Sequence, residues 1–258
     1  MLSKQKIKLV SSLKTKKYRD ELGLFIAEGD KNVCDLSQKF RCEMLFATEE
    51  WLKKNNTGCK FALAKEQIFS VKTSEELKHV SFLTTPQEIV AVFQKPAFKQ
   101  ITQEYLQNEL VFALDCIQNT GNLGTIIRIA DWFGISKIAC SKDTADVFNP
   151  KAVQAAMGAL ANVDVHYVNL HEFIVNAKEN GIEIFGTFLN GKNIYTETLS
   201  KNGIIVFGSE GNGISPKIES LIPNRLYIPN FSKNANKSES LNVATAAAVI
   251  CSEFRRRI

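Results

Sequence analysis

Residues 204–213, IIVFGSEGNG, are the stretch of this sequence that decides its fold. The first four residues are β-branched or aromatic, as in a strand buried on both faces, and the run ends abruptly in a glycine-rich turn. The glycine order is G-x-x-G-x-G instead of the G-x-G-x-x-G of a dinucleotide-binding turn, and Glu210 would repel a pyrophosphate. The turn therefore favours a neutral or cationic group, with an ordinary turn into a helix at Ser215-Pro216 as the alternative.

The same pattern of apolar strands separated by helices extends on both sides of this stretch. Strands are predicted at 110–115, 137–140, 163–168, 182–189, 203–208 and 225–229, and helices near 122–133, 150–160, 171–180, 215–221 and 240–256. Strands that are apolar on both faces and alternate with helices form a parallel sheet that is covered on both sides. The expected fold class is therefore α/β.

An earlier and smaller α/β pattern precedes this one. Helices are predicted at 3–22, where Gly23 ends the helix, at 31–40 and at 73–80, and strands at 24–29, 43–48, 59–64 and 88–94. The polar stretch that follows contains one proline and is expected to connect two domains. We therefore expect a small domain at 1–95, a linker at 96–109 and a second domain at 110–258.

Composition excludes several classes of protein. No apolar stretch of the 258-residue chain approaches the roughly 18–20 residues of a membrane span, and the basic start lacks the apolar core of a signal peptide. The six cysteines form no C-x-x-C pair, and the three histidines have no metal-site spacing. A cytoplasmic protein without a metal is expected, and free thiols are favoured over a disulfide or zinc site.

Basic residues gather at the two ends of a chain whose net charge is +5. Clustered lysines and arginines neutralise phosphates, so this distribution is compatible with nucleic acid, although a mildly basic surface is also common without it. The residues are Lys4, Lys6, Lys8, Lys14, Lys16, Lys17, Arg19, Arg255, Arg256 and Arg257.

Two further polar clusters also follow predicted strands. In DCIQNTGNLGTIIRIADWFG, residues 115–134, Asn122 is able to cap the helix that begins there. Arg128 is a charge in an otherwise apolar helix start, where an arginine usually meets a carboxylate or phosphate, a structural ion pair being the alternative. In the last cluster Ile228-Pro229 ends a strand, and Ser240-Leu241-Asn242 opens a helix of small residues.

Together the three clusters resemble the SpoU (TrmH-type) family of RNA 2′-O-ribose methyltransferases in the SPOUT superfamily. The family motif N-x-G-x-x-x-R matches residues 122–128, G-x-E-G-x-G matches residues 208–213, and I-P followed by S-L-N-V matches Ile228-Pro229 and residues 240–243. The segment KYRDELGLFIAEGDKNV, residues 17–33, also resembles the N-terminal substrate-binding domain of the ribosomal-RNA branch, which is similar to small RNA-binding ribosomal proteins.

This resemblance implies a deep trefoil knot in the parallel sheet, S-adenosylmethionine (SAM) as the cofactor, and a homodimer with a composite active site. It implies that Arg128 binds the RNA phosphate, which fits its bidentate chemistry. The catalytic residues that the resemblance implies are Asn122, Arg128, Glu210, Ser240 and Asn242. The residues that it implies for the SAM pocket are Leu189, Gly191, Gly208, Ile228 and Leu241.

The third motif departs from the family pattern. Many members have I-P-M-x-G and a short gap before S-L-N, whereas this chain has Asn230 and a longer loop in which Lys233 and Lys237 could contact RNA. The resemblance implies methylation of RNA, with ribosomal RNA favoured over transfer RNA. A catalytically weak RNA-binding accessory protein and a nucleotide-dependent oxidoreductase are the alternatives from other classes.

Overall fold

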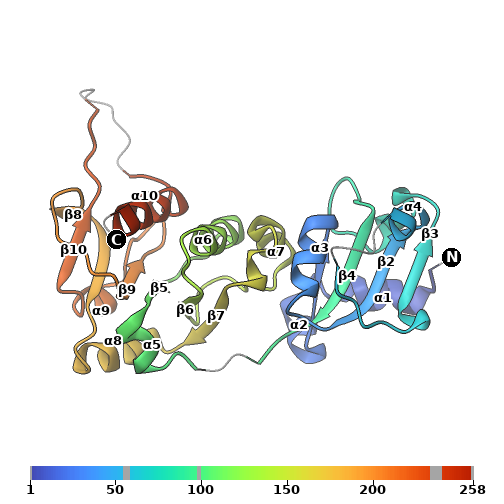
Figure 1. The fold of residues 1–258 in the computed structure, drawn as a ribbon, viewed down its shortest axis with the longest axis horizontal. Helices are drawn as coiled ribbons and strands as arrows, with labels where there is room; N and C mark the ends of the chain where they lie inside the picture. The colour runs from blue at the N-terminus through green and yellow to red at the C-terminus, as the bar shows by residue number, and fades with distance from the viewer. Residues whose placement is uncertain (1, 55–58, 98–99, 233–239, 257–258) are drawn as a thin grey trace. The chain divides into compact units, whose positions relative to one another are not determined.

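The computed structural model describes residues 2–54, 59–97, 100–232 and 240–256 (Figure 1). Contacts between α-carbons divide the chain into two units. The first comprises Met1–Ala97 and Asp146–Ala161, and the second comprises Phe98–Ala145 and Asn162–Ile258. No sequence pattern indicated that residues 146–161 would belong to the first unit.

The first unit contains a mixed sheet with the strand order β1-β4-β2-β3. Strand β4 (Ile89–Gln94) is antiparallel to β1 (Leu24–Glu28) and β2 (Cys42–Thr48), and β2 is parallel to β3 (Ile68–Val71). Its core includes the fully buried rings of Phe25, Phe46 and Phe93. The helices are α1 (Lys4–Ser12), α2 (Lys16–Leu22), α3 (Asp30–Ser37), α4 (Glu49–Lys54) and α7 (Pro150–Ala156), with 3-10 turns η1 (Lys65–Gln67), η2 (Ser74–His79) and η3 (Ala159–Ala161).

Three local predictions for this unit were wrong. The helix expected at 3–22 is broken into α1 and α2. The break leaves the carbonyls of Leu13 and Lys14 outside a helix, and Arg19 Nη1 donates a hydrogen bond to each of them, at 2.7 and 2.9 Å. The strand expected at 59–64 is irregular, and β3 follows it instead. The helix expected at 73–80 is the 3-10 turn η2, and α4 was not predicted.

A buried ion pair holds residue 146 in the first unit. Arg19 is 1% exposed, and its Nε and Nη2 atoms donate to Asp146 Oδ2 at 2.9 and 2.6 Å. The two carbonyl bonds described above occupy Nη1, so every nitrogen of the guanidinium has a partner. A buried charge is tolerable only when it is paired in this way.

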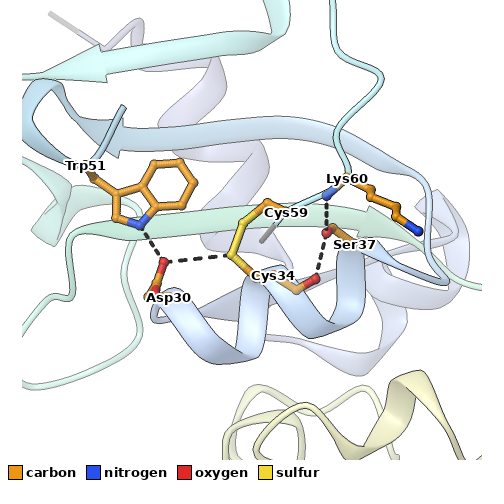
Figure 2. Close-up of a disulfide and its surroundings, with 6 residues drawn as sticks. All are labelled: Asp30, Cys34, Ser37, Trp51, Cys59 and Lys60. Carbon is orange, nitrogen blue, oxygen red and sulfur yellow. Dashed lines mark hydrogen bonds between the residues drawn. A yellow bond between two sulfur atoms is a disulfide. The ribbon is translucent and has the colours of Figure 1, made fainter. Parts of the chain in front are cut away.

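A disulfide joins Cys34 to Cys59, so the prediction of free thiols was wrong for this pair (Figure 2). Around it, the Ser37 hydroxyl donates to the Cys34 carbonyl at 2.7 Å and accepts from the Lys60 amide at 2.9 Å. The two cysteines are 25 residues apart, a separation that no short motif reveals. Cys42, Cys116, Cys140 and Cys251 are free, and burial raises the pKa of Cys42 to about 12.

The second unit contains the predicted parallel sheet. Its strand order is β10-β8-β9-β5-β6-β7, and every pair is parallel. The strands are β5 (Leu110–Leu114), β6 (Lys137–Ser141), β7 (Asp164–Val168), β8 (Ile184–Asn193), β9 (Gly203–Phe207) and β10 (Asn224–Tyr227). Its helices are α5 (Gln103–Asn108), α6 (Thr120–Trp132), α8 (Leu170–Glu179), α9 (Pro216–Glu219) and α10 (Val243–Arg256).

Helices cover both faces of this sheet. Leu106 of α5, Ile174 of α8 and Ile218 of α9 belong to one apolar cluster with alternate residues of β5 and β9. On the other face α6 packs against α10 (Figure 1). The Phe254 ring of α10 also meets that of Phe185 in β8, with the ring centroids 5.1 Å apart. Because all strands are parallel, the segments that follow β5, β9 and β10 begin at one edge.

Removal of the Asp146 carboxylate should destabilise the first unit. Asp146→Ala leaves the buried Arg19 guanidinium uncompensated, so we expect the free energy of unfolding to fall by about 3 kcal/mol. Urea unfolding followed by circular dichroism measures the change. Lys17→Ala, which removes an exposed ion pair with Glu21, is the control and should have no measurable effect. Equal stability of Asp146→Ala and the wild type would contradict the role of this pair.

The disulfide predicts the thiol content of the protein. In denaturant, Ellman's reagent should detect four thiols per chain before reduction and six after it. Cys59→Ser leaves Cys34 unpaired and should show one thiol more than the unreduced wild type. Six thiols in the unreduced wild type would show that the bond is absent.

Candidate active site

Three segments meet at the carboxyl edge of the second sheet and line an open cavity of about 240 Å³. They are the segment after β5, the glycine-rich turn after β9, and the start of α10. The residues that line the cavity are Ile117, Gln118, Asn119, Asn122, Ser209, Glu210, Gly211, Asn212 and Val243. Each of the three sequence clusters therefore contributes to the same cavity.

Asn242 joins the three segments through one side-chain amide. Its Nδ2 atom donates to Asn122 Oδ1 at 3.1 Å and to the Glu210 carboxylate. Its Oδ1 atom accepts from the amides of Ala244 (3.0 Å) and Thr245 (3.3 Å), and it thereby caps α10. Since backbone amides require the oxygen to face them, the amide has only one orientation that satisfies all four partners.

Asn122 is held from the other side by Asn119. The Asn119 Oδ1 atom accepts from the Asn122 amide at 3.0 Å, so Asn119 caps α6. The sequence allowed Asn122 to be the cap, but the structure gives that role to Asn119. The Asn122 side chain is thus free to accept from Asn242.

Asp115 is a site residue that sequence analysis did not single out. It follows β5, is 4% exposed, and accepts from the Ser215 amide at 2.7 Å. This bond fixes the end of the glycine-rich turn against the end of β5. A carboxylate that directly follows a fully apolar strand was the signal available in the sequence.

Cys116, beside Asp115, has a positive φ of 56°. Burial raises the pKa of its thiol, with the nearby Asp115 charge acting in the same direction. The thiol is therefore protonated near neutral pH and is a poor nucleophile.

Arg128 and Ser240, the other two predicted catalytic residues, are both exposed and do not line the cavity. Within the described ranges, the Arg128 guanidinium has no hydrogen bond or ion pair to another side chain. The structural ion pair considered for Arg128 is thus absent from the part of the chain that the structure describes.

Four of the predicted cofactor residues lie in or directly after three neighbouring strands. Leu189 and Gly191 lie in the irregular end of β8, Gly208 follows β9, and Ile228 follows β10. Leu189 is 71% exposed, and Leu241, beside Asn242, is 50% exposed. Exposed apolar side chains at such an edge are available to a ligand.

Gly208 is required by the turn itself. A Cβ atom at Gly208 would lie 2.1 Å from the Gly213 carbonyl carbon. The turn closes on itself there, because the Ser209 and Gly213 backbones exchange two hydrogen bonds of 2.9 Å. Gly213 has φ +66°, which glycine adopts without strain. The glycine pattern therefore encodes the shape of the turn that presents Glu210.

Among the described residues, no group of three or more His, Cys, Asp or Glu side chains is arranged to hold a metal ion. In the same ranges, no helix has the length and apolar character needed to cross a membrane.

An all-parallel sheet whose strand-end segments converge on one cavity is the arrangement in which α/β proteins bind their ligands. Residues 109–252 match the sequence model of the SpoU rRNA Methylase family, and residues 4–91 match that of the MRM3-like substrate binding domain. The chain belongs to the SpoU rRNA methylase family. The predicted family and α/β fold are confirmed, and with them the prediction of a SAM-dependent RNA methyltransferase.

Individual relatives resemble the chain over its whole length. The 23S rRNA (guanosine(2553)-2′-O)-methyltransferase RlmP of Bacillus subtilis is 32% identical to this chain. The alignment covers 97% of this chain and 96% of RlmP. A solved structure described as a putative RNA methyltransferase of the TrmH family from Porphyromonas gingivalis has 39% identity and a TM-score of 0.88, with both chains fully covered. An AdoMet-bound rRNA methyltransferase from Sinorhizobium meliloti has 25% identity and a TM-score of 0.81, with 100% of this chain and 97% of that chain covered.

The two roles of Asn242 can be separated by substitution. Asn242→Asp keeps an oxygen for the helix cap but loses the donor and places a second carboxylate beside Glu210. We expect at least about a 100-fold loss of methyl transfer with nearly unchanged stability. Asn242→Ala should lose activity and also about 1 kcal/mol of stability, because the cap is lost.

Single-turnover methyl transfer and urea unfolding measure these effects. Ser252→Ala, on an exposed position of the same helix, is the control and should change neither. An active Asn242→Asp enzyme would show that the contacts with Asn122 and Glu210 are not needed.

Proposed function

We propose that this protein transfers the methyl group of SAM to a ribose 2′-hydroxyl of large-subunit ribosomal RNA. The observation that carries the proposal is the Asn242 amide, which binds Asn122 and Glu210 at one cavity. Similarity to RlmP over nearly the whole chain, together with the matched substrate-binding domain at residues 4–91, favours ribosomal over transfer RNA.

The reaction forms a bond between the 2′-oxygen and the methyl carbon and breaks the sulfur–carbon bond of the sulfonium. The hydroxyl proton is released to solvent during the attack, and the products are the 2′-O-methylated ribose and S-adenosylhomocysteine, whose sulfur is uncharged. The main requirement is that the hydroxyl is held in line with the methyl group. Glu210, Asn242 and Ser240 supply polar atoms that orient the hydroxyl.

Arg128 binds the RNA phosphate next to the reacting ribose in this proposal. Its guanidinium is exposed and has no side-chain partner among the described residues, so no existing ion pair has to be broken. A guanidinium forms bidentate bonds to phosphate but rarely acts as a base. Positioning and charge neutralisation are therefore its assigned roles.

The adenosine end of SAM lies, in this proposal, along the ends of β8, β9 and β10. Leu189, Gly191, Gly208, Ile228 and Leu241 line that pocket, and no metal takes part. In this proposal the chain of the methyltransferase domain also forms a trefoil knot around the pocket. Asn230 begins the long loop of the third motif, and Lys233 and Lys237, expected to contact RNA, lie outside the described residues.

We further propose that two copies form a homodimer with composite active sites. Arg128 does not line the cavity of its own chain, and Trp132, one turn later on α6, is 85% exposed. An exposed tryptophan beside an unpartnered arginine suits a face that meets a second copy, which would bring Arg128 to the partner's cavity.

The remaining assignments follow from the same proposal. Residues 1–95 act as the RNA-binding domain, 96–109 as the linker and 110–258 as the methyltransferase domain. In this proposal the protein works in the cytoplasm. Mapping of 2′-O-methylation on ribosomal RNA from cells with and without the protein tests the substrate, and an unchanged ribosomal RNA beside an altered transfer RNA would favour the tRNA alternative.

Arg128→Ala should separate chemistry from cofactor binding. We expect methyl transfer to fall by at least about 100-fold, because a charge-assisted phosphate contact is lost at the reacting ribose. The dissociation constant for SAM, measured by calorimetry, should stay within about twofold of the wild type.

Lys178→Ala is the matched control, because it also removes a positive charge, at an exposed position of α8. It should leave both the rate of methyl transfer and the dissociation constant for SAM unchanged. A parallel loss of SAM affinity and activity in Arg128→Ala would place Arg128 in the cofactor pocket. Tight NAD binding without SAM binding by the wild type would favour an oxidoreductase.

A further inference from the structure

The pairing of β8 with β10 contains a large irregularity. Arg225 pairs with Gly186, but the next residue of β10, Leu226, pairs with Lys192. Residues 187–191 therefore bulge out of the ladder with β10. The pairing of β8 with β9 also ends at Gly186, so these residues have no ladder partner on that side either.

The Arg225 side chain fixes this bulge by contacts with two of its residues. The guanidinium carbon lies 3.7 Å from the centroid of the Phe188 ring, and Nη2 donates to Asn190 Oδ1 at 3.0 Å. On its other side, Nη1 donates to the Glu219 carboxylate of α9 at 2.5 Å. A planar guanidinium is suited to stacking on a ring while it donates at its edges.

The Arg225 backbone touches the bulge as well. A Cβ atom at Gly191 would lie 2.7 Å from the Arg225 carbonyl oxygen, so a larger residue would push the bulge away. Gly191 thus permits the close approach, and the Arg225 side chain spans Phe188 and Asn190 on either side of Leu189. Fixing a segment without ladder bonds costs backbone entropy, which these contacts offset.

Two features of the bulge are available to a ligand. Leu189 is 71% exposed although both of its neighbours are held. The backbone groups of residues 187–191 are outside the sheet ladder, and polar backbone groups that become buried need a partner. A nucleoside offers both an apolar ring face and polar edges for such groups.

We propose that Arg225 is a positioning residue that preforms the bulge at 187–191 as the binding edge for the adenosine part of SAM. The inference rests on the proposed function, which places Leu189 and Gly191 in the cofactor pocket. Arg225 acts through Phe188 and Asn190 and does not contact the reacting atoms. The Glu219 carboxylate accepts a hydrogen bond from Nη1 and so fixes the orientation of the guanidinium.

Arg225→Ala tests this role. We expect the dissociation constant and the KM for SAM to rise about 10-fold, while kcat at saturating SAM and the KM for RNA stay within about twofold. Arg225→Lys keeps the charge for Glu219 but loses the planar stacking and the bond to Asn190, so its SAM affinity should be intermediate. A general loss of structure would instead lower kcat and the affinity for both substrates.

Asn190→Ala supplies a second arm that does not disturb Glu219. It should weaken SAM binding by a smaller factor, and the double variant with Arg225→Ala should be no worse than Arg225→Ala alone, because the two residues act through one contact. Lys192→Ala, which removes an exposed ion pair with Glu197 next to the bulge, is the matched control and should leave SAM binding unchanged.

The outcomes distinguish this inference from the proposed function. If the wild type binds SAM and methylates RNA while Arg225→Ala binds SAM equally well, only the role of Arg225 is overturned. Were Arg225→Ala unable to fold, wild-type SAM affinity in both Arg225→Lys and Asn190→Ala would overturn it. A wild type that does not bind SAM would overturn both.

Discussion

The arrangement of the candidate active site depends on one side-chain amide. Asn242 donates to Asn122 and to Glu210, and its oxygen caps α10. These partners come from three segments more than 30 residues apart in the chain. Because the side-chain oxygen of Asn242 faces the backbone amides of α10, its NH₂ group must point toward Asn122 and Glu210. One side chain therefore serves both the cap of α10 and the contacts of the site.

The parallel sheet makes that contact possible. Its strands all end at one edge, so the segments that follow β5, β9 and β10 start close together. Three other polar residues then set the shape of individual segments. Asp115 fixes the end of the turn that carries Glu210, and Asn119 fixes the start of α6. Arg225 fixes the bulge of β8. The common direction of the strands and these three contacts set the positions of the site segments.

Sequence patterns predicted the parts of the fold that local chemistry encodes. All six strands of the second sheet were predicted, since each is a short apolar run bounded by turn residues. Predictions failed where distant contacts override local preference. Arg19 breaks the helix expected at 3–22, because the carbonyls of Leu13 and Lys14 turn toward its guanidinium, and the segment expected as a strand at 59–64 is irregular where Cys59 joins Cys34.

The sequence by itself determined the three motifs and the α/β class, because each depends on residue type and short spacing. Through the family resemblance it also predicted Asn122, Glu210 and Asn242 as site residues. Only the tertiary structure decided that Asn119 caps α6, that Asp146 pairs with Arg19, and that the Arg225 side chain holds residues 187–191. A periodic pattern shows which face of an element is apolar. It does not show which of several polar side chains meets a given partner, because that choice depends on how distant segments are brought together.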